Sequence, residues 1–312
     1  MDTVIGPLRA ADLATADWIF RQAFGQHFGL PDPQTFAGDA ALIATRWRAN
    51  PDAAFGAYEG DRLVGSSFAT TWGSFGFVGP VSVHPDLWNK GVAQQLLEHT
   101  VAHLDRTARQ SALFTFPNSP KHIALYQKFG FWPQYLTPVM TKQPVQNAGD
   151  AGALSRYSSL SAAERATCLA QCAALTDKIY SGLNLQSEIR SIAEQGLGDT
   201  LLIHDARGVA GFACCHIGAG SEAVTGRTFI KFAAVRPGSD APDLFERLLD
   251  RCEAVAAESG CDTIMAINAA RHQAYRQMIA RGFRTLLSGV AMLRPHEPAH
   301  NRPDCFVIDD LR

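Results

Sequence analysis

The stretch that decides the fold, residues 81–97, reads Val-Ser-Val-His-Pro-Asp-Leu-Trp-Asn-Lys-Gly-Val-Ala-Gln-Gln-Leu-Leu. An apolar strand ends at Pro85, and a helix begins beside Gly91 and Ala93, which have almost no side chain. An anion can therefore approach the backbone closely, and the free N–H groups of the first helical turn point toward it with the positive end of the helix dipole. This junction predicts a binding site for a nucleotide-type pyrophosphate.

The spacing of the small residues separates this junction from two other phosphate-binding loops. Neither Gly-x-x-x-x-Gly-Lys-Ser/Thr nor Gly-x-Gly-x-x-Gly occurs here at a strand-to-helix junction. The pattern Val-x-Pro, then x-x-Gly-x-Ala, resembles instead the acetyl-CoA pyrophosphate loop of the GNAT superfamily of N-acetyltransferases. Downstream, residues 122–131 are similar to that family's Ala-x-x-Leu-Tyr-x-x-x-Gly-Phe. The alternative is that Gly91 and Ala93 only begin a packed helix.

The resemblance implies that acetyl-CoA lies in a V-shaped opening between the fourth and fifth strands of the domain. Its pantetheine arm would pair with the fourth strand, and its pyrophosphate would rest on the amides of residues 89–94. The family's CoA-binding asparagine is replaced by Ser119, with Asn118 one position earlier, and Trp88 stands where Arg or Gln is usual. The residues expected at the cofactor are Val81, Val83, Asn89, Lys90, Gly91, Val92, Ala93, Gln94, Asn118 and Ser119.

The same resemblance implies direct attack of an amine on the thioester, with Tyr126 in the family's position for the acid that protonates the CoA thiolate. A phenol, with a reference pKa near 10, stays protonated at neutral pH. The alternative is a helix tyrosine that only packs on the sheet. The expected fourth strand contains no carboxylate to act as the base, and His84 stands where that strand turns toward solvent. His27 lies in the segment that usually borders the acceptor, and we take it as the candidate substrate residue.

Composition and charge limit the class of protein. A chain of 312 residues with 46% hydrophobic and 19% charged residues fits two globular domains. A net charge of −2 disfavours nucleic acid and anionic membranes as partners. The first residues lack the pattern of a secretory signal, and no stretch has the length of a membrane span, so we expect a cytoplasmic protein. All seven cysteines fall in the second half without Cys-x-x-Cys pairs, which predicts reduced, buried thiols and no metal site.

An internal repeat organises the chain. At a constant offset of 152 residues, Val83 falls on Val235 and Pro85 on Pro237. At the same offset three site positions change, because Gly91 maps onto Asp243, Ala93 onto Phe245 and Tyr126 onto Met278. A carboxylate and a bulky ring both oppose diphosphate binding. We therefore expect only the first copy to bind the cofactor, with the second as a scaffold or part of the acceptor pocket.

The predicted fold class is α/β (α+β), with two tandem GNAT-like domains. Each domain is expected to be a mixed, mostly antiparallel twisted sheet with helices on both faces. The boundaries are 1–144 for a catalytic, acetyl-CoA-binding domain, 155–294 for a degenerate copy and 295–312 for an arm packed over the surface. A linker rich in Gly, Asn, Ala and Pro is expected at 143–154.

The sequence thus predicts an acetyltransferase that moves an acetyl group from acetyl-CoA, as co-substrate, to the primary amine of a small molecule. The chain is expected to act as a monomer or homodimer. Two alternatives stay open at this point. One is a longer acyl-CoA transferase of the same fold, and the other is a noncatalytic acyl-CoA-binding regulatory protein.

Overall fold

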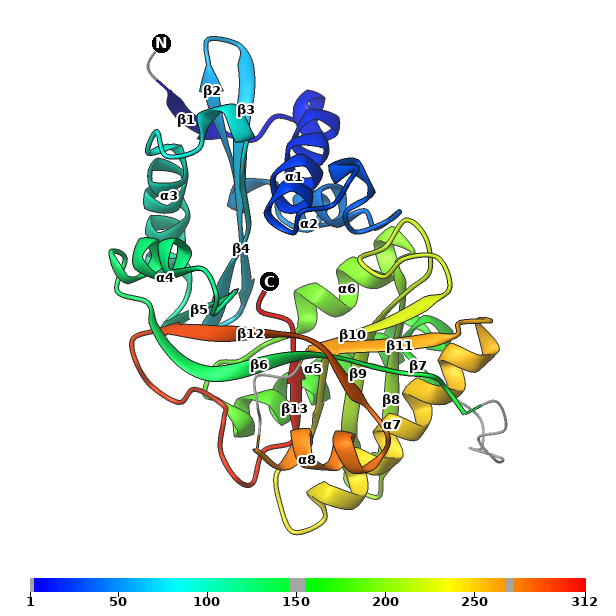
Figure 1. Cartoon of the computed structure of the whole chain (residues 1–312). Coiled ribbons are helices and arrows are strands. Elements are labelled where there is room, and N and C mark those ends of the chain that lie inside the picture. Colours follow the sequence, from blue (N-terminus) through cyan, green and yellow to red (C-terminus); the bar gives the residue numbers. More distant parts are fainter. Residues whose placement is uncertain (1–2, 146–154, 268–271) are drawn as a thin grey trace.

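A single twisted sheet runs through the computed structural model, which describes residues 3–145, 155–267 and 272–312 (Figure 1). The first half contributes β1 (Val4–Pro7), β2 (Ala54–Glu59), β3 (Arg62–Trp72), β4 (Phe75–Val83), β5 (Gln110–Thr115) and β6 (Trp132–Lys142). The second half contributes β7 (Ser155–Arg156), β8 (Gly198–Asp205), β9 (Gly208–Ile217), β10 (Arg227–Val235), β11 (Thr263–Ile267), β12 (Arg284–Arg294) and β13 (Val307–Asp309). The linker expected at 143–154 lies largely outside the described residues.

Helices cover both faces of each half (Figure 1). They are α1 (Leu13–His27), α2 (Leu42–Ala49), α3 (Val92–Thr107), α4 (Pro120–Gln127), α5 (Ala162–Ile179), α6 (Gln186–Gln195), α7 (Ala241–Glu258) and α8 (His272–Ala280). Their starts follow ordinary helix chemistry. Ser161 and Glu164 form a capping box at α5, and Pro120 is the first residue of α4. In the first half α3 and α4 lie on one side of the sheet, and α1 and α2 lie on the other.

The order of the strands shows an exchange between the halves. The order is β1-β2-β3-β4-β5-β12-β6-β11-β10-β9-β8-β7, so β12 lies between β5 and β6, and β6 lies between β12 and β11. The first half therefore inserts β6, and the second half inserts β12, into the sheet of the other. The tandem GNAT-like architecture is confirmed, but the two sheets are not closed separately as the repeat suggested. The sequence shows that β6 and β12 are equivalent, but it does not specify their neighbours.

The last residues of the chain do not pack over the surface, and that expectation was wrong. Cys305 to Leu311 are all buried, and β13 pairs antiparallel with β10 inside the molecule. Figure 1 shows this segment crossing from the second half to a position beside β4. The polar residues in this segment have buried partners. His300 Nε2 lies 3.0 Å from Asp309 Oδ2, and Asp310 contacts Arg46.

Two further predictions concern the cysteines and membrane spans. The seven cysteines are free and buried, as expected for reduced thiols. Among the described residues, no helix has the length and apolar character needed to cross a bilayer. In the same residues there is no cluster of three or more metal-ligating side chains.

Candidate active site

An opening between β4 and β5 begins where their pairing ends. Residues 75–78 of β4 pair in parallel with residues 110–113 of β5, and the strands then diverge. On the other side of β4, the His84 N–H donates to the Val64 carbonyl of β3 at 2.8 Å. Since backbone groups alternate in direction along a strand, those of Val81 and Val83 point into the opening. The structure thus places both residues where a pantetheine arm could pair with them.

Trp88 contacts the end of β4 in a way that the sequence did not reveal. Its indole Nε1 donates to the Val83 carbonyl at 2.8 Å, so that acceptor is occupied in the structure described here. The Lys121 ammonium lies 5.9 Å from the centre of the same ring. Trp88 therefore connects the end of β4 to the start of α4, and the groups of Val83 left for a ligand are its N–H and its side chain.

The start of α3 has the geometry of an anion cradle. Gly91 precedes the helix with φ +83°, and Asn89 has φ +65°, so the loop turns through two left-handed residues. The Lys90 amide donates to the Leu87 carbonyl at 3.4 Å. In residues 3–145, 155–267 and 272–312, no chain acceptor takes a hydrogen bond from the other expected amides, which are those of Asn89, Gly91, Val92, Ala93 and Gln94. A β carbon at Gly91 would meet no atom within 4 Å, so the cradle is open.

Asn118 and Ser119 lie in the turn between β5 and α4, at the wide end of the opening. Ser119 is the N-cap of α4, and its side chain makes no capping hydrogen bond. Asn118 is exposed. Both polar side chains remain available to a ligand that leaves the opening between β4 and α4.

Tyr126 lies in the last turn of α4 and is half-buried. It packs against a cluster that includes Val78, Leu113 and, from the second half, Met292. Burial raises the pKa of the Tyr126 phenol to about 12. The side chain therefore keeps its proton throughout the neutral range, as a proton donor must.

His27 is brought to the same region by the end of α1. Its ring stacks on Phe116 at 5.6 Å between centres and lies 5.2 Å from the ring of His122. His122 occupies the Ala position of the family pattern and lies one helical turn before Tyr126. Burial, His27 and Lys121 lower the pKa of His122. No role for His122 was predicted from the sequence, although a histidine in a small-residue position is a visible signal.

In the second half, the equivalent opening is filled by the chain itself. Residues 227–230 of β10 pair with β11, and beyond them β13 takes the place beside β10. Ala233 and Val235 are the positions equivalent to Val81 and Val83, and Ala233 pairs with Ile308 of β13. Phe245 and Met278 are fully buried. The strand β13 thus occupies the position that a pantetheine arm would take in this half.

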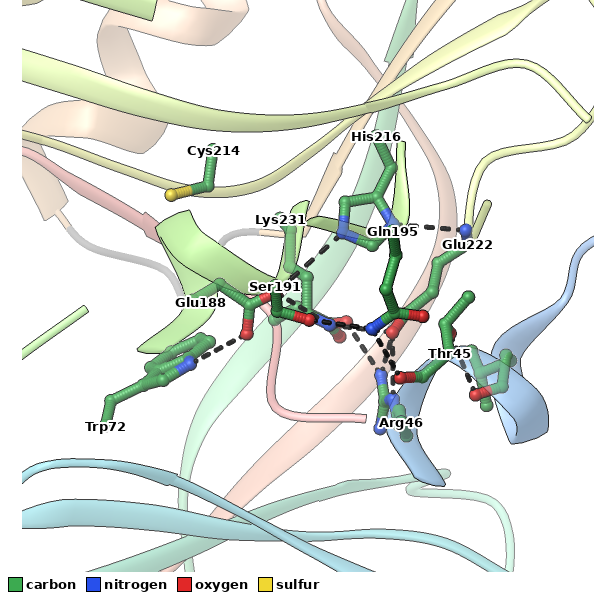
Figure 2. A network of polar contacts seen from close by, with 12 residues as sticks. Thr45, Arg46, Trp72, Glu188, Ser191, Gln195, Cys214, His216, Glu222 and Lys231 are labelled. Atoms are coloured by element: carbon green, nitrogen blue, oxygen red, sulfur yellow. Dashed lines mark hydrogen bonds and ion pairs between the residues drawn. The ribbon is translucent and has the colours of Figure 1, made fainter. Parts of the chain in front are cut away.

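A network of buried charges joins the halves on the α1 and α2 side of β4 (Figure 2). Arg46 of α2 binds both carboxylate oxygens of Glu222, at 3.1 and 2.9 Å, and Asp310 at 3.1 Å. Lys231 of β10 lies 2.7 Å from Glu222 and 3.3 Å from Glu188. Burial opposes the charge of Glu222, but the nearby cations Arg46 and Lys231 hold its pKa well below the usual range. These groups therefore stay ionised inside the interface.

A polar cavity of about 90 Å³ lies within this network. Its lining includes Arg46, Thr70, Glu188, His216 and Lys231. His216 Nδ1 accepts the Glu222 N–H at 3.1 Å, so a neutral ring carries its proton on Nε2. Among the described residues, no hydrogen-bond partner reaches that Nε2, and the Glu188 carboxylate is 3.8 Å away.

This network was not predicted from the sequence. The one sign of it in the sequence was Lys231, a charged residue in the middle of an apolar strand. The partners of Lys231 come from distant segments, so their pairing depends on the tertiary fold.

Comparison with known proteins finds a family match in the first half. Residues 14–131 match the Acetyltransferase (GNAT) family. These residues form a GNAT domain. This GNAT domain contains the opening, the cradle and Tyr126, and its membership supports acyl transfer as its general chemistry. Among curated proteins, no sequence matches the chain.

Solved structures extend the likeness to the whole chain. A proposed acetyltransferase from Pyrococcus horikoshii has a TM-score of 0.70 at 14% identity, covering 99% of this chain and 95% of its own. A GCN5-related N-acetyltransferase from Sphaerobacter thermophilus has a TM-score of 0.59 at 14% identity, covering 94% and 95%. A tandem GNAT protein from the clavulanic acid biosynthesis pathway has a TM-score of 0.55 at 15% identity, covering 94% and 98%. At these identities the likeness concerns the fold, and the fold is that of tandem GNAT proteins.

Proposed function

We propose that the GNAT domain, residues 1–144, transfers an acetyl group from acetyl-CoA to the primary amine of a small molecule. Residues 155–294 form the degenerate copy. Residues 295–312 form an arm that contacts both halves, at β10 and at Phe114. The observation that carries the proposal is the set of open amides at Asn89, Gly91, Val92, Ala93 and Gln94, which lies next to the opening between β4 and β5. Pyrophosphate is the anion that such a cradle fits.

The opening supports direct transfer between two bound substrates. The amine nitrogen attacks the thioester carbonyl carbon, the carbon–sulfur bond breaks, and the sulfur leaves with the bonding electron pair. Tyr126 donates its proton to that sulfur, and the proton lost by the amine passes to solvent or to a nearby base. His122 is a candidate for that base, because its lowered pKa favours the neutral ring. It also lies on the same face of α4 as Tyr126, one helical turn earlier.

The acceptor would approach from the α1 and α2 side of the sheet. His27 borders this side near β5, and the polar cavity lies there between the halves. A cavity of about 90 Å³ with paired charges favours a small polar acceptor over a folded protein surface. The second half then has a defined role, because Glu188, His216 and Lys231 supply part of the cavity wall.

The same geometry accounts for a single cofactor site. In the second half β13 fills the equivalent opening, and Asp243 in the first turn of α7 would repel a diphosphate. A noncatalytic acyl-CoA-binding protein remains the competing proposal. It predicts the same binding with no release of free CoA in the presence of any amine.

The test pairs Gly91→Asp with Gly91→Asn in calorimetric titrations with acetyl-CoA. Both side chains are similar in size and must adopt φ +83°, so only the charge differs. A carboxylate at contact with a phosphate costs about 4 kcal/mol at an effective dielectric constant near 20, which is about a thousandfold in affinity. We expect Gly91→Asp to lose binding and Gly91→Asn to retain most of it. Equal affinities for the two variants would refute the cradle.

Turnover is measured as release of free CoA thiol over a panel of small amines. Release that depends on one amine class supports the transferase. Tight acetyl-CoA binding with no release over the whole panel would favour the regulatory alternative.

A further inference from the structure

The position of the acyl group follows from the direction of the opening, and this step rests on the proposed function. A pantetheine arm that begins at residues 89–94 passes Val83 and then Val81 along β4. Pro80 and Gly79 follow toward the closed end of the opening. The opening closes at Val78 and Leu113, the last pair between β4 and β5. The acyl group would therefore stand beside Val81 and point toward this closed end.

Residues 311 and 312 fill that closed end. The Phe114 N–H, one residue beyond the last β5 pair, donates to the Leu311 carbonyl at 2.8 Å. Gly79 faces Arg312 so closely that a β carbon on Gly79 would lie 2.3 Å from the Arg312 carbonyl carbon. We call residues 310–312 the strap. The strap is thus the wall beyond the acyl group.

Ion pairs fix the strap in this place. Arg46 donates to the Gly79 carbonyl at 2.8 Å, to the Arg312 carbonyl and to Asp310 at 3.1 Å. Asp310 also accepts from the Arg312 N–H at 3.0 Å and from its guanidinium at 2.9 Å. Asp310 and Leu311 are buried at 0% and 1% exposure. Displacing the strap would break the buried pair between Arg46 and Asp310 and leave Arg46 with Glu222 alone, so the wall resists a larger ligand.

We propose that the strap sets the acyl-chain length, so that the site takes the acetyl thioester and excludes longer acyl chains. An acetyl group adds one methyl beyond the carbonyl, whereas a butyryl group adds two more methylenes that would have to enter the volume of Leu311 and Arg312. Overpacking of this kind is disfavoured in a close-packed interior. The acyl specificity of the first half is therefore determined by residues that follow the second.

The experiment compares acetyl-CoA with butyryl-CoA in the thiol-release assay. The unaltered chain should favour acetyl-CoA by about tenfold or more in kcat/KM, since each excluded methylene is worth about tenfold or more. A chain ending after Asp310 loses the wall but keeps the Asp310 contact to Arg46, and its preference should fall to near unity. Leu311→Ala should lower the preference for acetyl-CoA partly. This variant provides the test if the shortened chain does not fold. Leu202→Ala is the matched control, because Leu202 belongs to the same buried cluster on distant β8.

Each outcome decides between defined alternatives. An unaltered chain that uses both thioesters equally would overturn the inference without any variant. An equal rise in turnover with both thioesters after shortening would also overturn it, because the strap would then be a general obstruction. No acetyl-CoA binding by the unaltered chain would overturn the proposed function itself, and this inference with it. If the preference for acetyl-CoA falls in the strap variants but not in Leu202→Ala, the result would support the proposal that the strap limits the length of the acyl chain.

Discussion

Replacing Arg46 with methionine tests whether the interface between the halves depends on one buried cation. The Arg46 side chain is 3% exposed, and Glu222 and Asp310 are completely buried. Methionine fills much of the volume but removes the charge and the donors that reach both carboxylates and the Gly79 carbonyl. Removing one partner of a buried ion pair costs about 3–5 kcal/mol, because the remaining charge is uncompensated. Glu222 keeps Lys231 as a partner, so we expect a loss near the lower end of that range.

The assay is urea unfolding followed by circular dichroism, with the free energy of unfolding obtained from the midpoint and slope. Arg62→Met is the matched control, because Arg62 pairs with Glu59 at 2.8 Å and its side chain is 65% exposed. An exposed pair of this kind contributes about 1 kcal/mol or less. Arg46→Lys should give an intermediate loss, since lysine keeps the charge without the planar fork. If Arg46→Met and Arg62→Met lose the same free energy, the buried network does not hold the halves together and the reasoning is refuted.

The remaining predictions concern the proton donor and a buried carboxylate. Tyr126→Phe should lower kcat about a hundredfold with little change in acetyl-CoA affinity, since a positioned acid contributes about that much, and unchanged turnover would remove Tyr126 from the mechanism. Burial alone would raise the pKa of Glu188, but Lys231 and His216 together lower it to about 2 from an ordinary value of 4.5. A lowered folded pKa adds stability that is complete above pH 4.5 and is lost as the pH falls toward 2, here about 3 kcal/mol. Glu188→Gln should flatten the urea stability profile across that acid range, and an unchanged slope would contradict the assignment.

Local features of the site could be predicted from the sequence because they depend on neighbours in the chain. Gly91 has a left-handed backbone conformation, which favours glycine, so the loop before α3 was recognisable from its spacing. The period of the apolar residues predicted α3, and the offset of 152 predicted that β6 and β12 are equivalent. Tyr126 was placed by its motif, and the structure adds the burial that raises its pKa.

The sequence by itself predicted the two copies, the strand and helix pattern and a small-residue loop at 89–94 that the second copy lacks. Only the tertiary structure decided that β6 and β12 change places, that β13 fills the second opening and that residues 310–312 close the first. These pairings join segments far apart in the chain, and many other segments have the same apolar or charged character as the actual partners. Their choice depends on shape and burial in the folded interface, which a local pattern does not encode.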